Sequence, residues 1–212
     1  MVKLENPYQY QISTLKLVIH VFILFILGYL CFTLHIFSFL YQYSIAMMIL
    51  ILIAFLFDRE LVSSDRILKV DFMALRWIPL IVSAAAVFFI LYFIIKTLAE
   101  ITLIGDLFRR GSDISNTEYV LFMILVLPTV EETFFRGYLQ YNLMHRIGIK
   151  AAYIVASLIY TTFFLFTKNI WIIFIFLILG FYMGYIFLRN KSTLVNITIH
   201  SLFMLLLFIY PS

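Results

Sequence analysis

About seven apolar runs constrain this chain more than any other feature, since each is close to the ~20 residues that a helix needs to cross a bilayer. The runs lie near residues 15–34, 37–57, 78–97, 119–138, 150–167, 170–188 and 193–210. An α-helix can satisfy its own backbone hydrogen bonds within hydrocarbon, whereas an irregular segment cannot. The sequence therefore predicts an all-α fold, a polytopic membrane bundle of about seven transmembrane helices.

Composition supports the same class of protein. The chain is 65% hydrophobic and 12% charged, whereas soluble domains are roughly 45–50% apolar and about 25% charged. With 212 residues, one domain is expected. We predict a single membrane domain over residues 1–212, with N-terminal helices and loops at 1–118 and a core at 119–210. Within the first part, the charged stretches 58–77 and 98–118 are predicted to be loops.

The basic residues indicate orientation rather than a nucleic-acid partner. The net charge is +4, but Lys and Arg stand singly at the ends of apolar runs and form no basic stripe. An N-terminus in the cytoplasm places most of them inside, as the positive-inside rule requires. The inside set is then Lys3, Lys16, Arg59, Arg66, Lys69, Arg76, Arg146, Lys150, Arg189 and Lys191. We predict a multi-pass protein of the cell membrane, surrounded by membrane lipid, with a cytoplasmic N-terminus; the oligomeric state is left open.

Two adjacent glutamates stand inside the fourth apolar run, where a carboxylate costs several kcal/mol and usually persists because it pairs or does chemistry. Glu132 and Arg136 are four residues apart, so helical geometry predicts an ion pair on one face. Glu131 should point about 100° away, toward Phe134 and Phe135. Apolar surroundings and a neighbouring like charge would disfavour its ionised form, as in a general base that works near neutral pH.

Pro128 bears on how water could reach this pair. Proline lacks an N–H, so the carbonyl of Ile124 loses its helical partner, and a local opening there would admit water beside Glu131. An alternative needs no water: Glu132 and Arg136 form a buried structural ion pair, and Glu131 is neutral.

The segment Glu131-Glu132-Thr-Phe-Phe-Arg136-Gly137-Tyr-Leu139 resembles the first motif of the CPBP family, the CAAX-protease and bacteriocin-processing intramembrane proteases. Gly180-Phe-Tyr-Met-Gly184 is similar to the glycine-containing helix before the last motif of that family. Ser192-Thr-Leu-Val-Asn-Ile-Thr-Ile-His200 resembles the approach to the third motif, with His200 in the histidine position. The resemblance covers roughly residues 119–208, and the short chain is most similar to bacterial members.

The resemblance implies hydrolysis of a peptide bond within the membrane, in a membrane-associated peptide or protein. Glu131 would activate water, and Glu132 and Arg136 would support it. His200, with an asparagine, would stabilise the oxyanion, a role worth several kcal/mol. No cofactor or metal is expected, because two imidazoles are not available in one place as zinc ligands.

Two positions depart from the family pattern. The second motif is Phe followed four residues later by His, and if Phe163 is the phenylalanine then Thr167 takes the histidine position. Threonine can hydrogen-bond water but cannot accept its proton near pH 7. The third motif has Asn four residues after His, where this chain has Met204; Asn196, on the same helical face as His200, is a possible substitute. His20 is a second possible imidazole, although helix packing explains it more simply.

Two functions follow from these observations. The intact first motif favours an intramembrane endopeptidase of the glutamate type. The missing histidine favours a non-catalytic relative, a membrane scaffold, chaperone or bacteriocin-immunity-type protein for a cell-envelope partner. A proton-coupled transporter would also explain buried acids, but it would usually show an internal repeat, and the sequence has none.

Overall fold

The structure is a computed structural model, and the residues it describes are almost entirely helical. These residues are 13–34, 39–58, 83, 86, 87, 90, 93 and 117–209. No strand occurs among them, so the predicted all-α class is confirmed. The predicted span 78–97 and the predicted loops 58–77 and 98–118 lie largely outside the described residues, and the total of about seven spans remains a prediction.

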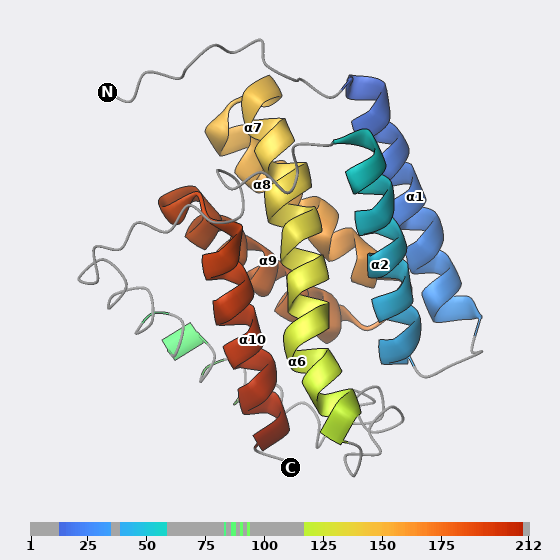
Figure 1. Cartoon of the computed structure of the whole chain (residues 1–212), viewed down its shortest axis with the longest axis vertical. Coiled ribbons are helices and arrows are strands. Elements are labelled where there is room, and N and C mark those ends of the chain that lie inside the picture. The colour runs from blue at the N-terminus through green and yellow to red at the C-terminus, as the bar shows by residue number, and fades with distance from the viewer. Residues whose placement is uncertain are drawn as a thin grey trace.

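The first two helices form a hairpin. Helix α1 spans Thr14–Thr33 and begins after Ser13, whose hydroxyl accepts a backbone N–H of the first turn. Helix α2 spans Phe39–Phe57 and runs back alongside α1 (Figure 1). The side chain of Gln42 donates to the carbonyl of Leu34 at 2.6 Å and so ties α2 to the end of α1. The sequence placed these spans at 15–34 and 37–57, within two residues of the observed bounds.

The fourth predicted span is part of a longer helix with an irregular middle. Helix α6 spans Thr117–Glu132, a π-helix η2 spans Thr133–Gln140, and α7 spans Tyr141–Ile147. The chain then turns at Gly148, whose φ of 82° is a conformation that glycine adopts without steric cost. The sequence predicted a plain helix over 119–138, because 3.6-residue periodicity does not register a π-turn.

The last three predicted spans agree closely with the structure. Helix α8 spans Ile149–Thr162 and ends in a 3₁₀ turn η3 at Phe163–Thr167. Helix α9 spans Ile170–Asn190 and begins at Asn169, whose side-chain oxygen accepts two backbone N–H groups. Helix α10 spans Thr193–Ile209.

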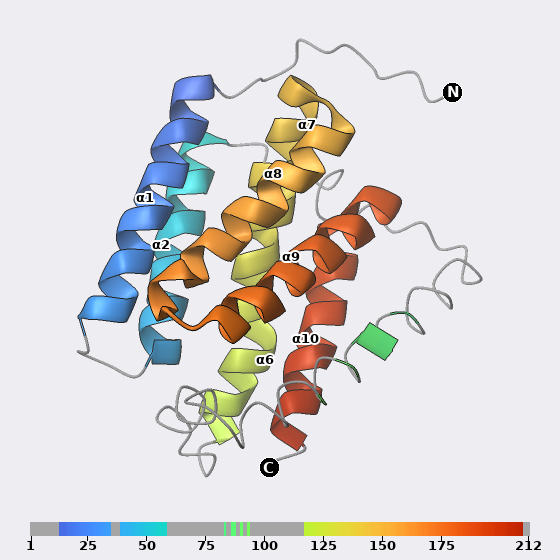
Figure 2. The same cartoon turned by 180° about the vertical axis from the view of Figure 1, so that it is seen from behind.

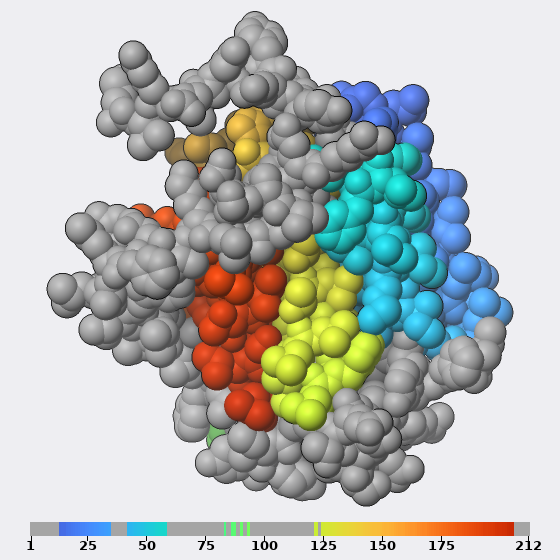
Figure 3. Space-filling view, in the orientation of Figure 1, coloured from blue at the N-terminus to red at the C-terminus, as the bar shows by residue number. Residues whose placement is uncertain are grey.

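The helices pack so that α6 and η2 lie at the centre of the bundle. On the face seen in Figure 1, α6 lies between α2 and α10, and the same three helices lie side by side in the space-filling view of Figure 3. From behind, α8 and α9 cross the other face (Figure 2). The π-helix contacts α2, α8, α9 and α10, and all of its residues are buried.

Three helical segments of the described chain are long and apolar enough to cross a membrane. They are α1, α8 with its 3₁₀ extension, and α9. Shorter apolar helices run over Gln42–Phe57 and Thr193–Leu205. By length and composition these elements fit a membrane bundle.

The glycines of α9 allow that helix to approach α8 closely. A Cβ at Gly180 would lie 2.8 Å from Tyr160 Cδ1 and 3.1 Å from the Ser157 carbonyl oxygen. A Cβ at Gly184 would lie 2.8 Å from Ser157 Oγ and 3.0 Å from Tyr153 Cδ2. The Gly-x-x-x-Gly spacing therefore serves packing within the bundle, as small residues often do between membrane helices.

We expect Gly180→Ala to destabilise the bundle by about 1–3 kcal/mol, the usual cost of overpacking a filled interior. The added methyl meets the backbone of α8 as well as a buried ring, so it cannot be relieved by one side-chain rotation. Unfolding of the purified protein in mixed detergent micelles would measure the change. Phe174→Ala on the exposed side of α9 is the control; equal loss in the two variants would contradict the packing argument.

Candidate active site

Glu132 is the centre of a buried network that joins η2 to α10. Its Oε2 lies 3.4 Å from Arg136 Nε and accepts a hydrogen bond from Asn196 Nδ2 at 3.2 Å. Its Oε1 lies 3.0 Å from His200 Nδ1. All four side chains are buried. The ion pair predicted from the four-residue spacing is confirmed.

Arg136 is fixed by more than the carboxylate. Its Nη2 donates to the carbonyl of Gly180 on α9 at 3.4 Å. Its guanidinium carbon lies 5.0 Å from the centre of the Tyr160 ring and 5.9 Å from that of Phe135. Desolvated cation–π contacts of this kind stabilise a buried cation. The arginine thus joins η2 to both α8 and α9.

Gln140 repeats this connection one turn further along η2. Its Nε2 donates to the carbonyl of Gly184 at 3.1 Å. Arg136 and Gln140 are four residues apart, as are Gly180 and Gly184. The π-helix is therefore held against the glycine face of α9 by two side-chain hydrogen bonds to backbone carbonyls.

Glu131 occupies a different environment from its neighbour. Its side chain is buried, and its Oε2 lies 4.0 Å from His200 Nε2. Its Oε1 has no hydrogen-bond partner within the part of the chain that the structure describes. A buried carboxylate oxygen without a partner is costly, so this oxygen calls for an explanation such as a bound water or a catalytic role.

Two tyrosines also face Glu131, and sequence reasoning missed both of them. Tyr43 from α2 and Tyr160 from α8 are buried, and both hydroxyls lie within electrostatic reach of the Glu131 carboxylate. The Tyr160 hydroxyl makes no hydrogen bond that meets distance and angle criteria with any described group. Phenylalanine and tyrosine are frequent throughout this chain, so the sequence alone does not distinguish Tyr43 and Tyr160, which face Glu131, from the other aromatic residues.

The arrangement fixes the orientation of the His200 ring. A carboxylate can only accept hydrogen bonds, so the proton between Glu132 and His200 is assigned to Nδ1. The other nitrogen, Nε2, then faces Glu131. A histidine held by a carboxylate on one nitrogen and presented to a reactive centre by the other is a recurrent catalytic arrangement.

Asn196 contacts the Glu132 network, and Thr167 forms its hydrogen bonds elsewhere. Besides Glu132, Asn196 Nδ2 donates to the carbonyl of Met183 at 2.8 Å, so it links α10 to α9. Thr167 Oγ1 donates to the Phe164 carbonyl and accepts the N–H of Asn169, both within the turn between α8 and α9. The α8 side chain that faces Glu131 is Tyr160, about two turns before Thr167 at 3.6 residues per turn.

His20 is a packing residue and does not replace the missing imidazole. Its Nδ1 lies 2.7 Å from the Tyr138 hydroxyl and 3.0 Å from the carbonyl of Lys16. Its ring packs edge-on against Phe57 and Tyr138. The simpler of the two interpretations offered for His20 therefore fits the structure.

A metal would need more ligands than the described residues bring together. No group of three or more His, Cys, Asp and Glu side chains that could hold an ion occurs among them. The single cysteine, Cys31, is buried in α1, and its thiol donates to the Gln42 carbonyl at 3.4 Å.

One comparison with known proteins covers the helices from α6 to α10. Residues 114–206, from α6 to α10, match the family model described as type II CAAX prenyl endopeptidase Rce1-like. This part of the chain is therefore similar to the Rce1-like endopeptidases of the CPBP family, and the predicted resemblance is confirmed there. Together with the apolar helices, it identifies a membrane protein. Comparison with the curated proteins and with the solved structures gave no match.

Arg136→Ala should destabilise the folded protein by about 3–5 kcal/mol, because it leaves the buried Glu132 carboxylate without its cation. Detergent or thermal unfolding of the purified protein would measure the loss. Arg189→Ala, which removes a cation from the exposed end of α9, is the control and should change stability by less than about 1 kcal/mol. Similar stability of the two variants would show that the Glu132 network is not structural.

Proposed function

We propose that this chain is an intramembrane endopeptidase of the glutamate type that hydrolyses a peptide bond in a membrane-associated peptide or protein. The observation that carries the proposal is the difference between the two neighbouring acids. Glu132 has three buried partners, whereas Glu131 keeps one oxygen unpaired and faces an imidazole nitrogen at 4.0 Å. A structural ion pair accounts for Glu132 and Arg136 but gives no reason to bury Glu131.

The proposed role of Glu131 is that of a general base. A separation of 4.0 Å between Oε2 and His200 Nε2 is longer than a direct hydrogen bond, and it is of the kind that a water molecule can bridge. Glu131 would take a proton from this water, and the resulting hydroxide would form a bond to the carbonyl carbon of the substrate. Glu131 would then return the proton to the leaving nitrogen as the C–N bond breaks.

The remaining groups would orient the ring and stabilise charge. Glu132 holds His200 by Nδ1, and Asn196 and Arg136 hold Glu132 in turn. His200, when both of its ring nitrogens carry a proton, would donate from Nε2 to the oxyanion of the tetrahedral intermediate, and the hydroxyl of Tyr160 would donate to the same oxygen. Donors fixed in a water-poor site before reaction stabilise such charge most effectively, because they need not reorganise.

In this proposal Tyr160 compensates in part for the second-motif histidine that the chain lacks. A phenol cannot act as the base near neutral pH, but it can donate a hydrogen bond. Its hydroxyl is buried, faces Glu131 and lacks a geometrically adequate hydrogen bond to another described group. Thr167, which the sequence suggested for the histidine position, forms its hydrogen bonds within the turn after α8.

Orientation in the membrane is part of the proposal. The start of α1, the turn between α7 and α8 and the turn between α9 and α10 lie toward one end of the described bundle, and the turn between α8 and α9 lies toward the other (Figures 1 and 2). The first set of segments contains Lys16, Arg146, Lys150, Arg189 and Lys191, and the last turn contains Lys168. The positive-inside rule then assigns the first end, where α1 begins, to the cytoplasm. We infer a multi-pass protein of the cell membrane with its N-terminus on the cytoplasmic side.

One observation favours the alternative, a non-catalytic relative that acts as a scaffold, chaperone or immunity-type protein for a cell-envelope partner. The Glu132 network joins η2, α9 and α10, so the motif has a structural use even without a reaction. The absence of a second imidazole beside Glu131 among the described residues points the same way. The two functions differ in what they require of Glu131.

Glu131→Gln should abolish cleavage, with a rate loss of about 10²–10⁴-fold, because an amide cannot take the proton from water. The variant should remain folded, since Gln has nearly the same shape and its amide oxygen can still accept from the tyrosine hydroxyls that face Glu131. New peptide N-termini in membranes that contain either protein, identified by mass spectrometry, would report cleavage. Glu118→Gln, at the other end of α6, is the matched control. Equal sets of termini with wild type and Glu131→Gln would support the non-catalytic alternative.

Tyr160→Phe should lower kcat by about 10²-fold with KM nearly unchanged, the pattern expected when one oxyanion donor is removed. The ring that packs on Arg136 and Phe135 is retained, so stability should change little. The rate would be measured on a peptide identified by the comparison of wild type with Glu131→Gln. Tyr153→Phe removes a hydroxyl from the same helix and should have no effect; a full rate in Tyr160→Phe would exclude the phenol from the mechanism.

A further inference from the structure

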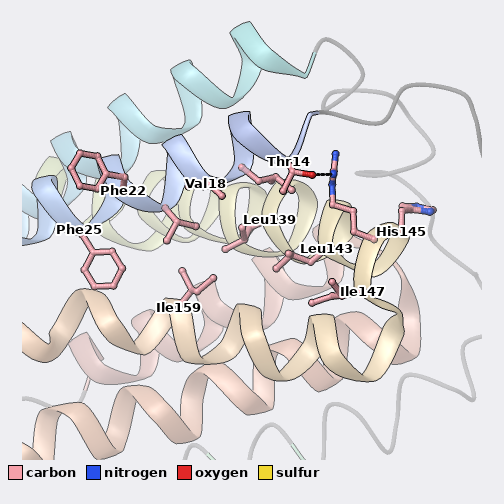
Figure 4. A pocket seen from close by; sticks show the side chains of 12 residues that line it. Thr14, Val18, Phe22, Phe25, Leu139, Leu143, His145, Ile147 and Ile159 are labelled. Atoms are coloured by element: carbon pink, nitrogen blue, oxygen red, sulfur yellow. Dashed lines mark hydrogen bonds between the residues drawn. The ribbon is translucent and has the colours of Figure 1, made fainter.

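An apolar groove lies between α1 on one side and η2, α7 and α8 on the other, and neither glutamate lines it. It has a volume of about 820 Å³, within the range of about 300–1,000 Å³ that is usual for ligand sites. One wall is formed by Val18, Phe22 and Phe25 of α1, and Ile159 of α8 and Leu139 of η2 lie opposite (Figure 4). The groove therefore lies between the first hairpin and the helices that carry the site.

Polar side chains gather at one end of this groove only. Thr14, His145 and Arg146 lie there, and the two phenylalanine rings lie at the other end (Figure 4). Arg146 Nη1 donates to Thr14 Oγ1 at 2.5 Å, which holds the guanidinium at the mouth of the groove. The groove thus has the polarity of an amphiphile, with a cationic head end and an apolar tail end.

The groove lies where a membrane lipid would meet the protein. Helix α1 is one of the candidate spans, and two of the lining side chains are largely exposed, Val18 at 59% and Phe22 at 65%. Thr14 is the first residue of that helix. The apolar part therefore faces hydrocarbon, and the polar end lies at the level of the lipid headgroups.

The charge at the polar end selects the headgroup. Arg146 is the cation among the described side chains that line the groove, and neither Lys16 nor Lys150 is one of them. Asp58, at the end of α2, is buried, accepts a hydrogen bond from Asn142 and does not line the groove. A planar guanidinium suits phosphate oxygens, which it can bind with two parallel hydrogen bonds.

We propose that this groove binds an anionic glycerophospholipid, with an acyl chain along α1 and the phosphate on Arg146. The occupant follows from the charge and the polarity of the groove, since a zwitterionic lipid would fill the apolar part but gain little from the cationic end. Basic pockets between membrane helices on the cytoplasmic side commonly bind anionic headgroups. The site is separate from the glutamates and does not depend on the proposed reaction.

The test compares phosphatidylglycerol with phosphatidylcholine of the same acyl chains, each added to the full-length protein in detergent micelles. Native mass spectrometry would measure how much of each lipid the protein retains. We expect about fivefold preference for phosphatidylglycerol, the effect of one cation near an anionic headgroup. Arg146→Gln should remove the preference while leaving some retention of both lipids.

Two further variants distinguish binding of lipid in the groove from attraction of lipid to the surface charge of the protein. Lys150→Gln removes a cation that does not line the groove, and it should leave the preference unchanged. Val18→Trp fills the apolar part and keeps Arg146, so it should lower retention of both lipids even if Arg146→Gln does not fold. Equal retention of the two lipids by wild type, equal effects of Arg146→Gln and Lys150→Gln, or unchanged binding to Val18→Trp would each overturn the proposal.

Discussion

The structure around the site depends on one buried carboxylate, that of Glu132. A charge taken out of water is tolerated only when its lone pairs are paired, and Glu132 meets this requirement with groups from two helices, Arg136 on η2 and Asn196 and His200 on α10. The same contacts fix the position of α10 relative to η2. Because His200 is held through Nδ1, its other nitrogen is presented to Glu131. One electrostatic requirement therefore organises both the packing of the bundle and the geometry of the candidate site.

Much of the fold follows from hydropathy, and the reason is physical. Hydrocarbon imposes a length and a composition on each spanning helix, so the predicted bounds of α1, α9 and α10 lie within a few residues of those observed. Hydropathy carries no information on local helix type, since a π-turn uses the same apolar residues as an α-turn. The eight residues of η2 were therefore predicted as regular helix although they form a π-helix.

The sequence predicted the parts of the candidate site that lie close together in the chain, or that include a charged residue within an apolar run. Glu132 and Arg136 share one helix, and their pairing follows from spacing alone. His200 and Asn196 were identified by family resemblance and by the periodicity of a single helix. Tyr43 and Tyr160 come from helices far apart in the chain, and nothing in their local sequence distinguishes them from the many other aromatic residues. Contacts of that kind depend on tertiary packing, which one sequence does not specify.

The π-helix has a geometric effect on how the central helix is used. In a regular α-helix, residues four apart overshoot a full turn and drift around the axis by about 40° at each step. Wider turns, closed by hydrogen bonds five residues apart, counter that drift, so Arg136 and Gln140 stay in line with the carbonyls of Gly180 and Gly184. Meanwhile Tyr138 and Asn142 are aimed at the opposite side, toward His20 and Asp58. The π-helix and the turn after it thus form hydrogen bonds with α9 on one side and with His20 and Asp58 on the other. Deletion of one residue from η2 would shift the side chains on both sides away from their partners.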